Sequence, residues 1–183
     1  MICQITALPR SGTAFIATMM NLGENCLAFH ELFVTDPHWS ATLREFTLRD
    51  LWPNQVVCDI GTYQYLPKAI IEDSKKIYIR QHPEKSRRRS QIAFGYDIPE
   101  AESEAWSDMA EKWVAKYNPL VIEQSELFNL YSLDRIWNYC NPHCIFPASK
   151  VALLLQMNIQ RMNPKKVFAK DAYLARQGEL WGS

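Results

Sequence analysis

The sequence predicts an α/β protein in which helices cover a mostly parallel sheet. The first indication is an apolar, β-type run, Ile2 to Leu8, that passes through a short turn into a helix-forming run, Ala14 to Leu22. The second is that strand-like and helix-like runs keep alternating along the chain, as they do in parallel sheets. Ligands of open sheets of this class bind along the carboxyl ends of the strands, so we expect a site at that edge.

The length and composition of the chain predict a single domain that spans residues 1–183. Hydrophobic residues make up 48% of the sequence, which is enough for a sizeable core. Twenty basic and twenty acidic side chains cancel, so the charge favours neither a nucleic-acid nor a membrane partner, and nothing indicates an oligomeric state. No apolar run approaches the roughly 20 residues that span a bilayer, and strand-like residues begin at Met1. We therefore expect a soluble cytoplasmic protein without a leader segment.

The turn between the first strand and the first helix, residues 9–13, has the features of an anion-binding site. Free N–H groups in the first turn of a helix and the positive end of its macrodipole attract negative charge. Gly12 allows a close approach of the backbone, and Arg10 offers a planar fork of donors to phosphate or sulfate oxygens. The plainer alternative is an ordinary strand–turn–helix connection in which Arg10 is only solvated.

This turn is not a Walker A loop, because no glycine lies five residues before Gly12 and Thr13 stands where that loop has lysine. It resembles instead the 5′-phosphosulfate loop, P-[KR]-S-G-T-T-[WF], of sulfotransferases that use 3′-phosphoadenosine 5′-phosphosulfate (PAPS). Pro9–Phe15 matches that loop except at Ala14, which removes one hydroxyl expected to contact the 5′-phosphate. The resemblance implies that Phe15 stacks on adenine. It implies that the nucleotide is bound by Arg10, Ser11, Gly12, Thr13, Ala14 and Phe15.

The resemblance also implies a fold and a reaction. The fold would be a P-loop-like three-layer sandwich of the sulfotransferase type. The donor would be PAPS, and the product would be adenosine 3′,5′-bisphosphate (PAP). This scheme requires no metal ion.

The second predicted strand, Cys26 to Phe29, is followed directly by two candidate catalytic residues, His30 and Glu31. An acidic residue just beyond a strand lies on the ligand side of an open sheet. Sulfotransferases that act on sugars have a catalytic glutamate just beyond the second strand. The resemblance therefore implies Glu31 as the general base, with His30 as the alternative; in the plainer interpretation Glu31 is a solvated loop carboxylate.

The middle of the chain contains an aspartate with two interpretations. We expect a helix at 40–51 capped by Ser40, a buried strand from Gln55 to Ile60 and a short helix at 67–73. Asp59, near the end of that strand, has the position of a Walker B aspartate, which would bind Mg²⁺ in a kinase. Since the loop lacks the Walker A lysine, we interpret Asp59 as a loop-edge or acceptor-side carboxylate.

A later strand, Lys75 to Arg80, resembles the 3′-phosphate site of the same family. In that site an arginine ends the strand, a proline follows, and a serine of the next helix completes the site. The resemblance implies that Arg80 and Ser90 bind the 3′-phosphate, although both spacings are longer here than in the family. The C-terminal tail resembles the family segment R-K-G-x-x-G-x-W, which implies that Arg176 and Gly178 contact the same phosphate.

The helix predicted from Pro83 to Phe94 carries four basic residues within little more than one turn. They allow a rival interpretation as a nucleic-acid patch. Side chains so closely spaced cannot all face one way, and no aromatic residues lie between them, so a solvated helix face is the favoured interpretation. These residues are Lys85, Arg87, Arg88 and Arg89.

Three more helices and one strand complete the expected elements. Residues 99–117 have apolar side chains at helical spacing and acidic residues in the first turns, which predicts a helix that packs on the core. Residues 119–128 resemble the late sulfotransferase segment in which a strand leads into a helix. The apolar face of that helix continues to Cys140, and a last helix is predicted at 148–162.

The cysteines indicate buried free thiols rather than disulfides or a metal site. They are odd in number and scattered, as is typical of a reducing compartment. Cys140, His143 and Cys144 lie close in sequence, but a structural zinc site usually has four ligands in paired spacings, and no second pair exists. We therefore interpret residues 141–142 as a helix-ending turn. The cysteines are Cys3, Cys26, Cys58, Cys140 and Cys144.

The sequence thus favours a PAPS-dependent sulfotransferase that moves a sulfuryl group to a hydroxyl or amine acceptor. Arg10 and the N–H groups of the loop would stabilise charge on the departing oxygen, and Glu31 would accept the proton of the acceptor. The acceptor, a small molecule or a saccharide, is not specified. One alternative is a P-loop kinase that uses ATP and Mg²⁺ with Asp59 on the metal. The other is a non-catalytic nucleotide-binding or assembly protein, which Ala14 and the shifted Ser90 favour.

Overall fold

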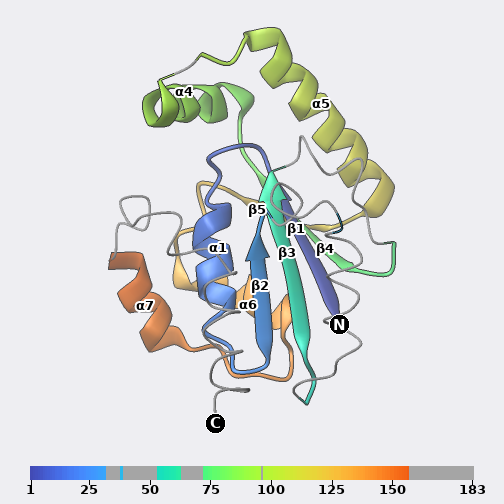
Figure 1. The fold of residues 1–183 in the computed structure, drawn as a ribbon, viewed down its shortest axis with the longest axis vertical. Coiled ribbons are helices and arrows are strands. Elements are labelled where there is room, and N and C mark those ends of the chain that lie inside the picture. Colours follow the sequence, from blue (N-terminus) through green and yellow to red (C-terminus); the bar gives the residue numbers. More distant parts are fainter. Residues whose placement is uncertain (32–37, 39–52, 63–71, 96, 157–183) are drawn as a thin grey trace.

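Five parallel strands form the centre of the molecule (Figure 1). The computed structural model describes residues 1–31, 38, 53–62, 72–95 and 97–156. The strands lie in the order β2-β3-β1-β4-β5, so β1 occupies the middle of the sheet. The strands are β1 (Ile2–Ala7), β2 (Cys26–His30), β3 (Val56–Thr62), β4 (Lys75–Arg80) and β5 (Leu120–Glu123).

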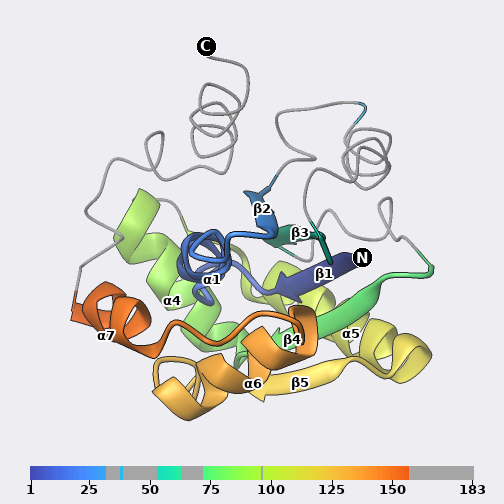
Figure 2. The same cartoon turned by 90° about the horizontal axis from the view of Figure 1, so that it is seen from below.

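Helices lie on both faces of this sheet, as Figure 2 shows. One face is covered by α1, α6 and α7, and α5 packs on the other face. The α/β class, with a parallel sheet between layers of helices and a P-loop-like strand–loop–helix at its start, is therefore confirmed. The helices are α1 (Thr13–Met20), α4 (Pro83–Phe94), α5 (Glu100–Tyr117), α6 (Leu130–Cys140) and α7 (Ala148–Gln156).

The hydrophobic core is divided by the sheet. On one face, apolar side chains from all five strands contact buried residues of α1, α6 and α7, among them Ile16 and Trp137. Trp137 is fully buried, and its indole N–H donates to the Cys144 carbonyl at 2.7 Å. On the other face, Tyr78 packs against Trp113 of α5. Burying side chains of this size stabilises the fold by about 1.5–3 kcal/mol each, so both layers are held firmly to the sheet.

The register of the strands brings their carboxyl ends to one edge. Ala7, the last residue of β1, pairs with Thr62 on one side and with Ile79 on the other. Arg80 in turn pairs with Glu123 at the end of β5. Consequently the connection between β1 and α1 lies at the centre of the edge where ligands of such sheets bind.

The predicted elements agree with the structure where both exist, with shifts at their ends. Strand β3 runs beyond Ile60, so Asp59 lies inside the strand and not at a loop edge. Helix α6 begins only at Leu130, because the Asn129 side chain caps it by accepting the Ser132 N–H at 2.8 Å. The helix expected at 40–51, most of that at 67–73 and the end of that at 148–162 lie outside the described residues. None of the helices described is long and apolar enough to span a membrane.

Candidate functional site

The β1–α1 loop presents an uncapped helix N-terminus at the centre of the carboxyl edge. Arg10 and Gly12 both have left-handed backbones, with φ of 63° and 96°. Gly12 precedes α1 without capping it, and the first helical bond runs from the Ile16 N–H to the Gly12 carbonyl at 3.1 Å. The N–H groups of residues 13–15 therefore have no acceptor within the helix, and they point out of its positive end, as an anion site requires.

Ser11 supports this interpretation independently. Its side chain is fully buried within the loop. The Ser11 hydroxyl nevertheless has no hydrogen-bond partner among the described residues. A buried polar group without a hydrogen-bond partner costs about 1–3 kcal/mol. A bound ligand that forms a hydrogen bond with the Ser11 hydroxyl would remove this cost.

One side of the loop is closed by the segment between β5 and α6. A methyl group built on Gly12 would lie 2.8 Å from the Leu127 side chain and 3.1 Å from the Phe128 ring, so glycine is required here for space as well as for its positive φ. The Phe15 ring is 7% exposed and meets Phe128 edge to face at 5.4 Å. Phe15 therefore has little free surface for adenine, and stacking on it requires Phe128 to move. Phe128, which is 47% exposed, is an aromatic group that the sequence analysis did not select.

Glu31 lies beside the loop. It directly follows β2, and its N–H donates to the Ile60 carbonyl of β3 at 2.8 Å, which fixes its backbone at a left-handed φ of 55°. Burial raises the pKa of the Glu31 carboxyl, while the Thr62 hydroxyl and the charge of Arg10 oppose that rise. Arg10, Glu31 and Thr62 thus come together from the ends of β1, β2 and β3.

His30 contacts Thr13, and its role as the alternative base stays a prediction. Its Nε2 lies 3.0 Å from the Thr13 hydroxyl at the start of α1. Burial lowers the pKa of the imidazole to about 4, so the ring is neutral at pH 7. A base with so low a pKa has little driving force for taking a proton at neutral pH, which favours Glu31 over His30.

Arg80 is bound by carboxylates in this structure. Its Nε and Nη2 donate to the two Glu111 oxygens of α5, each at 2.9 Å, and Nη1 lies 3.5 Å from Glu123. These side chains are 39–49% exposed, and exposed ion pairs are worth only about 0–1 kcal/mol. A phosphate would displace them at small cost. Binding of the 3′-phosphate by Arg80 stays a prediction.

Helix α4 supports the loop through contacts that the sequence analysis missed. The Ser86 hydroxyl donates to the Pro9 carbonyl at 2.7 Å. The Gln81 amide lies 3.5 Å from the same oxygen, and Arg89 donates to Gln81 at 2.9 Å. Ser90 follows Ser86 by one turn on the same helix face, fully buried, and its hydroxyl has no partner in the described part of the chain. In the sequence, the only indication of this helix face is the spacing of four residues between Ser86 and Ser90.

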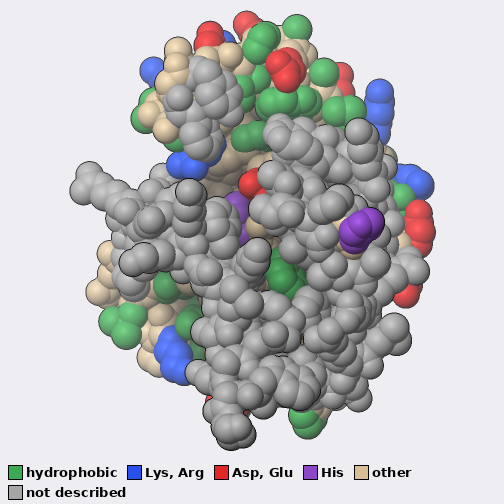
Figure 3. All heavy atoms as spheres, viewed as in Figure 1, with side chains coloured by type: hydrophobic (Ala, Val, Ile, Leu, Met, Phe, Trp, Pro, Cys, Tyr) green, Lys and Arg blue, Asp and Glu red, His purple; other side chains and the backbone are tan. Residues whose placement is uncertain are grey.

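The basic residues of α4 do not form a continuous patch. Arg87 lies 3.9 Å from the carboxylate of Asp97, and Arg89 bonds to Gln81. On the face shown in Figure 3, acidic and basic side chains are interspersed over α4 and α5. These observations support a solvated helix face over a nucleic-acid patch.

The interpretation of Asp59 as a loop-edge carboxylate is wrong. Asp59 is 2% exposed, pairs with Gln4 of β1 in the sheet register, and lies three residues before the end of β3. Burial raises its pKa to about 7, although the Gln4 side chain opposes that rise. A carboxylate that binds Mg²⁺ on a nucleotide must lie at the strand's end beside the loop, and Asp59 does not.

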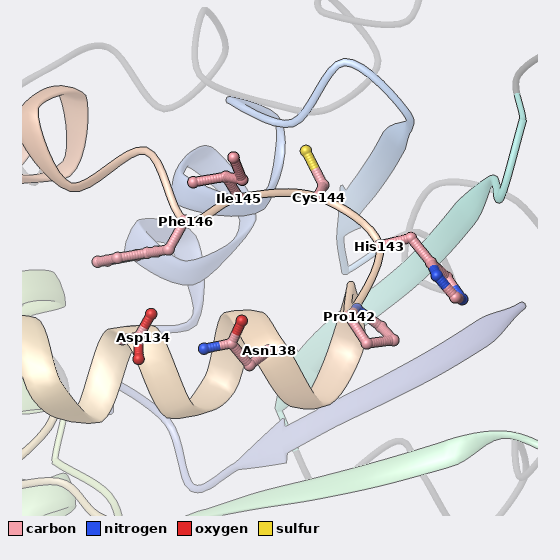
Figure 4. A pocket seen from close by; sticks show the side chains of 7 residues that line it. All are labelled: Asp134, Asn138, Pro142, His143, Cys144, Ile145 and Phe146. Carbon is pink, nitrogen blue, oxygen red and sulfur yellow. The ribbon is translucent and has the colours of Figure 1, made fainter.

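The segment with Cys140, His143 and Cys144 does not form a shared ligand set. Cys140 is buried in the core, whereas His143 and Cys144 line a pocket of about 490 Å³ beside the C-terminal half of α6 (Figure 4). The turn after Cys140 ends α6, as predicted. The pocket contains none of the predicted site residues. Arg176 and Gly178 lie outside the residues that the structure describes.

Comparisons with known proteins assign no family. No family model and no curated protein matches the sequence. Among solved structures, the chain is similar to the crystal structure of shikimate kinase from Bacteroides thetaiotaomicron, with 13% sequence identity and a TM-score of 0.39. The match covers 85% of this chain and 98% of that chain. At this identity and score, the likeness supports no statement about the site or its reaction.

Proposed function

We propose that the chain binds PAPS at the β1–α1 loop and transfers its sulfuryl group to a hydroxyl or amine acceptor. The observation that carries the proposal is the meeting of Glu31 and Arg10 at the uncapped N-terminus of α1. One loop supplies N–H donors and a cation for an anionic donor. The adjacent strand end supplies a carboxylate for the proton of the acceptor.

The proposed reaction assigns one task to each group. The acceptor oxygen or nitrogen attacks sulfur, the bond from sulfur to the bridging phosphate oxygen breaks, and that oxygen leaves with its electron pair on PAP. Arg10 and the N–H groups of residues 13–15 stabilise the charge that develops on this oxygen. Glu31 accepts the acceptor's proton, which its burial-raised pKa favours. His30 holds the Thr13 hydroxyl at the start of the helix.

A kinase that uses ATP and Mg²⁺ is the second candidate, favoured only by the strand–loop–helix that such enzymes share. Two observations weigh against it. Threonine and not lysine follows Gly12, and Asp59 lies too far inside β3 to reach a metal at the loop. A non-catalytic nucleotide-binding protein is compatible with the same loop.

Calorimetry with PAP, AMP and ATP–Mg²⁺ tests the proposal. PAP carries the 3′-phosphate that AMP lacks, and a charge-assisted hydrogen bond is worth about 1.5–3 kcal/mol, so PAP should bind at least about tenfold more tightly than AMP. Equal affinity for PAP and AMP would remove the sulfotransferase proposal, and Mg²⁺-dependent turnover of ATP would favour the kinase. Tight PAP binding without slow hydrolysis of PAPS would leave the non-catalytic alternative.

A further inference from the structure

Cysteines from distant parts of the sequence meet in the core. Cys3 of β1, Cys58 of β3 and Cys140 at the end of α6 bring their sulfur atoms within 4.8 Å of one another. Cys3 and Cys58 are direct neighbours in the parallel register. A fourth sulfur, that of Cys26 in β2, lies 3.9 Å from the Cys58 sulfur. All four side chains have no exposed surface.

We propose that Cys3, Cys58 and Cys140 form a closed binding site for one soft d¹⁰ cation, Cu(I) or Zn²⁺. Metal–sulfur bonds of about 2.3 Å place ligating sulfurs roughly 3.8–4.0 Å apart, so the thiols need to close by less than about 1 Å. Thiolate ligands select these ions over harder ones. The three sulfurs alone suit three-coordinate Cu(I), and recruitment of Cys26 gives the four ligands that Zn²⁺ prefers.

Thiols bind metal ions as thiolates, so the cluster must lose protons when a cation binds. A buried thiolate is costly without a cation beside it, and a soft metal supplies that charge. Uptake of the metal therefore releases protons, which gives a readout independent of any enzymatic activity.

Complete burial determines how the site is filled. No side-chain surface of the cluster is accessible in the folded chain, so the metal must enter while the chain folds. In such a site the free energy of metal binding adds to the free energy of unfolding. The cluster lies near the beginnings of β1 and β2, away from the carboxyl edge of the sheet, so this proposal does not depend on the proposed nucleotide site.

The test is refolding of the full chain under reducing, anaerobic conditions with Cu(I) or with Zn²⁺, followed by desalting. About one equivalent of one of the two ions should stay bound, with proton release and a rise in melting temperature. Cys144→Ser, which removes the partly exposed thiol outside the cluster, is the matched control and should bind as the unmodified chain does.

Cys58→Ser should lower the retained metal at least about tenfold, since loss of one of three ligands removes a metal–sulfur bond. If Cys58→Ser does not fold, Cys140→Ser is used in its place. Circular dichroism verifies that the variant is folded. Cys26→Ser distinguishes the two ions, because it should abolish the retention of Zn²⁺ and leave the retention of Cu(I) unchanged. Retention of neither ion, or equal retention by Cys58→Ser and the unmodified chain, would overturn the proposal.

Discussion

At the residue scale, two titrating side chains at the end of β2, His30 and Glu31, have opposite pKa shifts for the same reason. Burial favours the neutral form of each, so the pKa of Glu31 is raised and that of His30 falls to about 4. These directions favour Glu31 over His30 as the group that accepts a proton. The His30 Nε2 lies 3.0 Å from the Thr13 hydroxyl at the start of α1.

Replacement of Glu31 tests whether this residue is the general base or only a solvated loop carboxylate. Glu31→Gln keeps the size of the side chain but cannot accept a proton, so transfer from labelled PAPS, or its slow hydrolysis, should fall about 10²–10⁴-fold. Affinity for PAP, measured by calorimetry, should change little. A variant that turns over at the unmodified rate would end the assignment of Glu31 as base. In that case inactivity of His30→Ala would identify the other candidate.

Asp59 should make stability depend on pH. Its folded pKa of about 7 lies above its ordinary value of 3.8, so the folded state binds more protons between these values, and stability falls as pH rises from about 4 to 7. One pKa unit corresponds to about 1.4 kcal/mol, so the loss is at most about 4 kcal/mol. His30 has the opposite effect: because its pKa is lowered from 6.5 to about 4, it makes stability rise as pH rises from about 4 to 6.5.

Comparison of the unmodified chain with Asp59→Asn isolates this effect, since both contain His30. Urea unfolding at a series of pH values should show that the variant gains stability relative to the unmodified chain as pH rises from 4 to 7. A difference that stays constant with pH would show that Asp59 titrates near its ordinary value when folded.

At the scale of elements, the β1–α1 loop combines a strained backbone with a charge. Arg10 has a left-handed φ, which asparagine tolerates better than alanine does. Arg10→Asn should weaken PAP binding at least about tenfold, the worth of a charge-assisted contact, and leave the melting temperature of the nucleotide-free protein nearly unchanged. Arg10→Ala should weaken binding equally and also leave that melting temperature nearly unchanged, because arginine already has the left-handed strain that alanine would have. Unchanged PAP affinity in Arg10→Asn would place the arginine outside the site.

The loop and its flanking elements are the part of the site that sequence predicts best. Residues 2–22 have local signals for strand, turn and helix, and these need no knowledge of distant contacts. Asp59 was misplaced because Gly61 and Thr62 continue β3 by pairing with Thr6 and Ala7, although glycine is a weak strand former. The pairing of Arg80 with Glu111 depends on how α5 crosses the sheet. No local pattern contains that information.

At the scale of the whole molecule, the arrangement of the cysteines also depends on contacts that no local sequence pattern contains. The sequence correctly predicts that they are mostly buried and free. Their meeting follows from the strand order, which places β1 and β3 side by side, and from the end of α6 at Cys140. Spacing along the chain cannot reveal a cluster built in this way.

Thiol labelling should therefore report global unfolding of the metal-free chain. Cys144 is partly exposed and should react quickly with a thiol reagent, whereas the other cysteines are buried on β1, β2 and β3 or at the end of α6. Their labelling should require an opening with nearly the full free energy of unfolding. Cys144→Ser should remove the fast phase alone. Fast labelling of a second thiol in the folded chain would contradict this.

The close approach of Leu127 and Phe128 to Gly12 bears on how the chain can vary in evolution. Any side chain at position 12 collides with the segment before α6, and a bulkier residue in that segment pushes on the loop. Substitutions in these two stretches must therefore be accepted together, although they lie far apart in the sequence. A directed-evolution library aimed at a new donor should diversify both stretches at once, because changes in either alone will mostly be lost to selection.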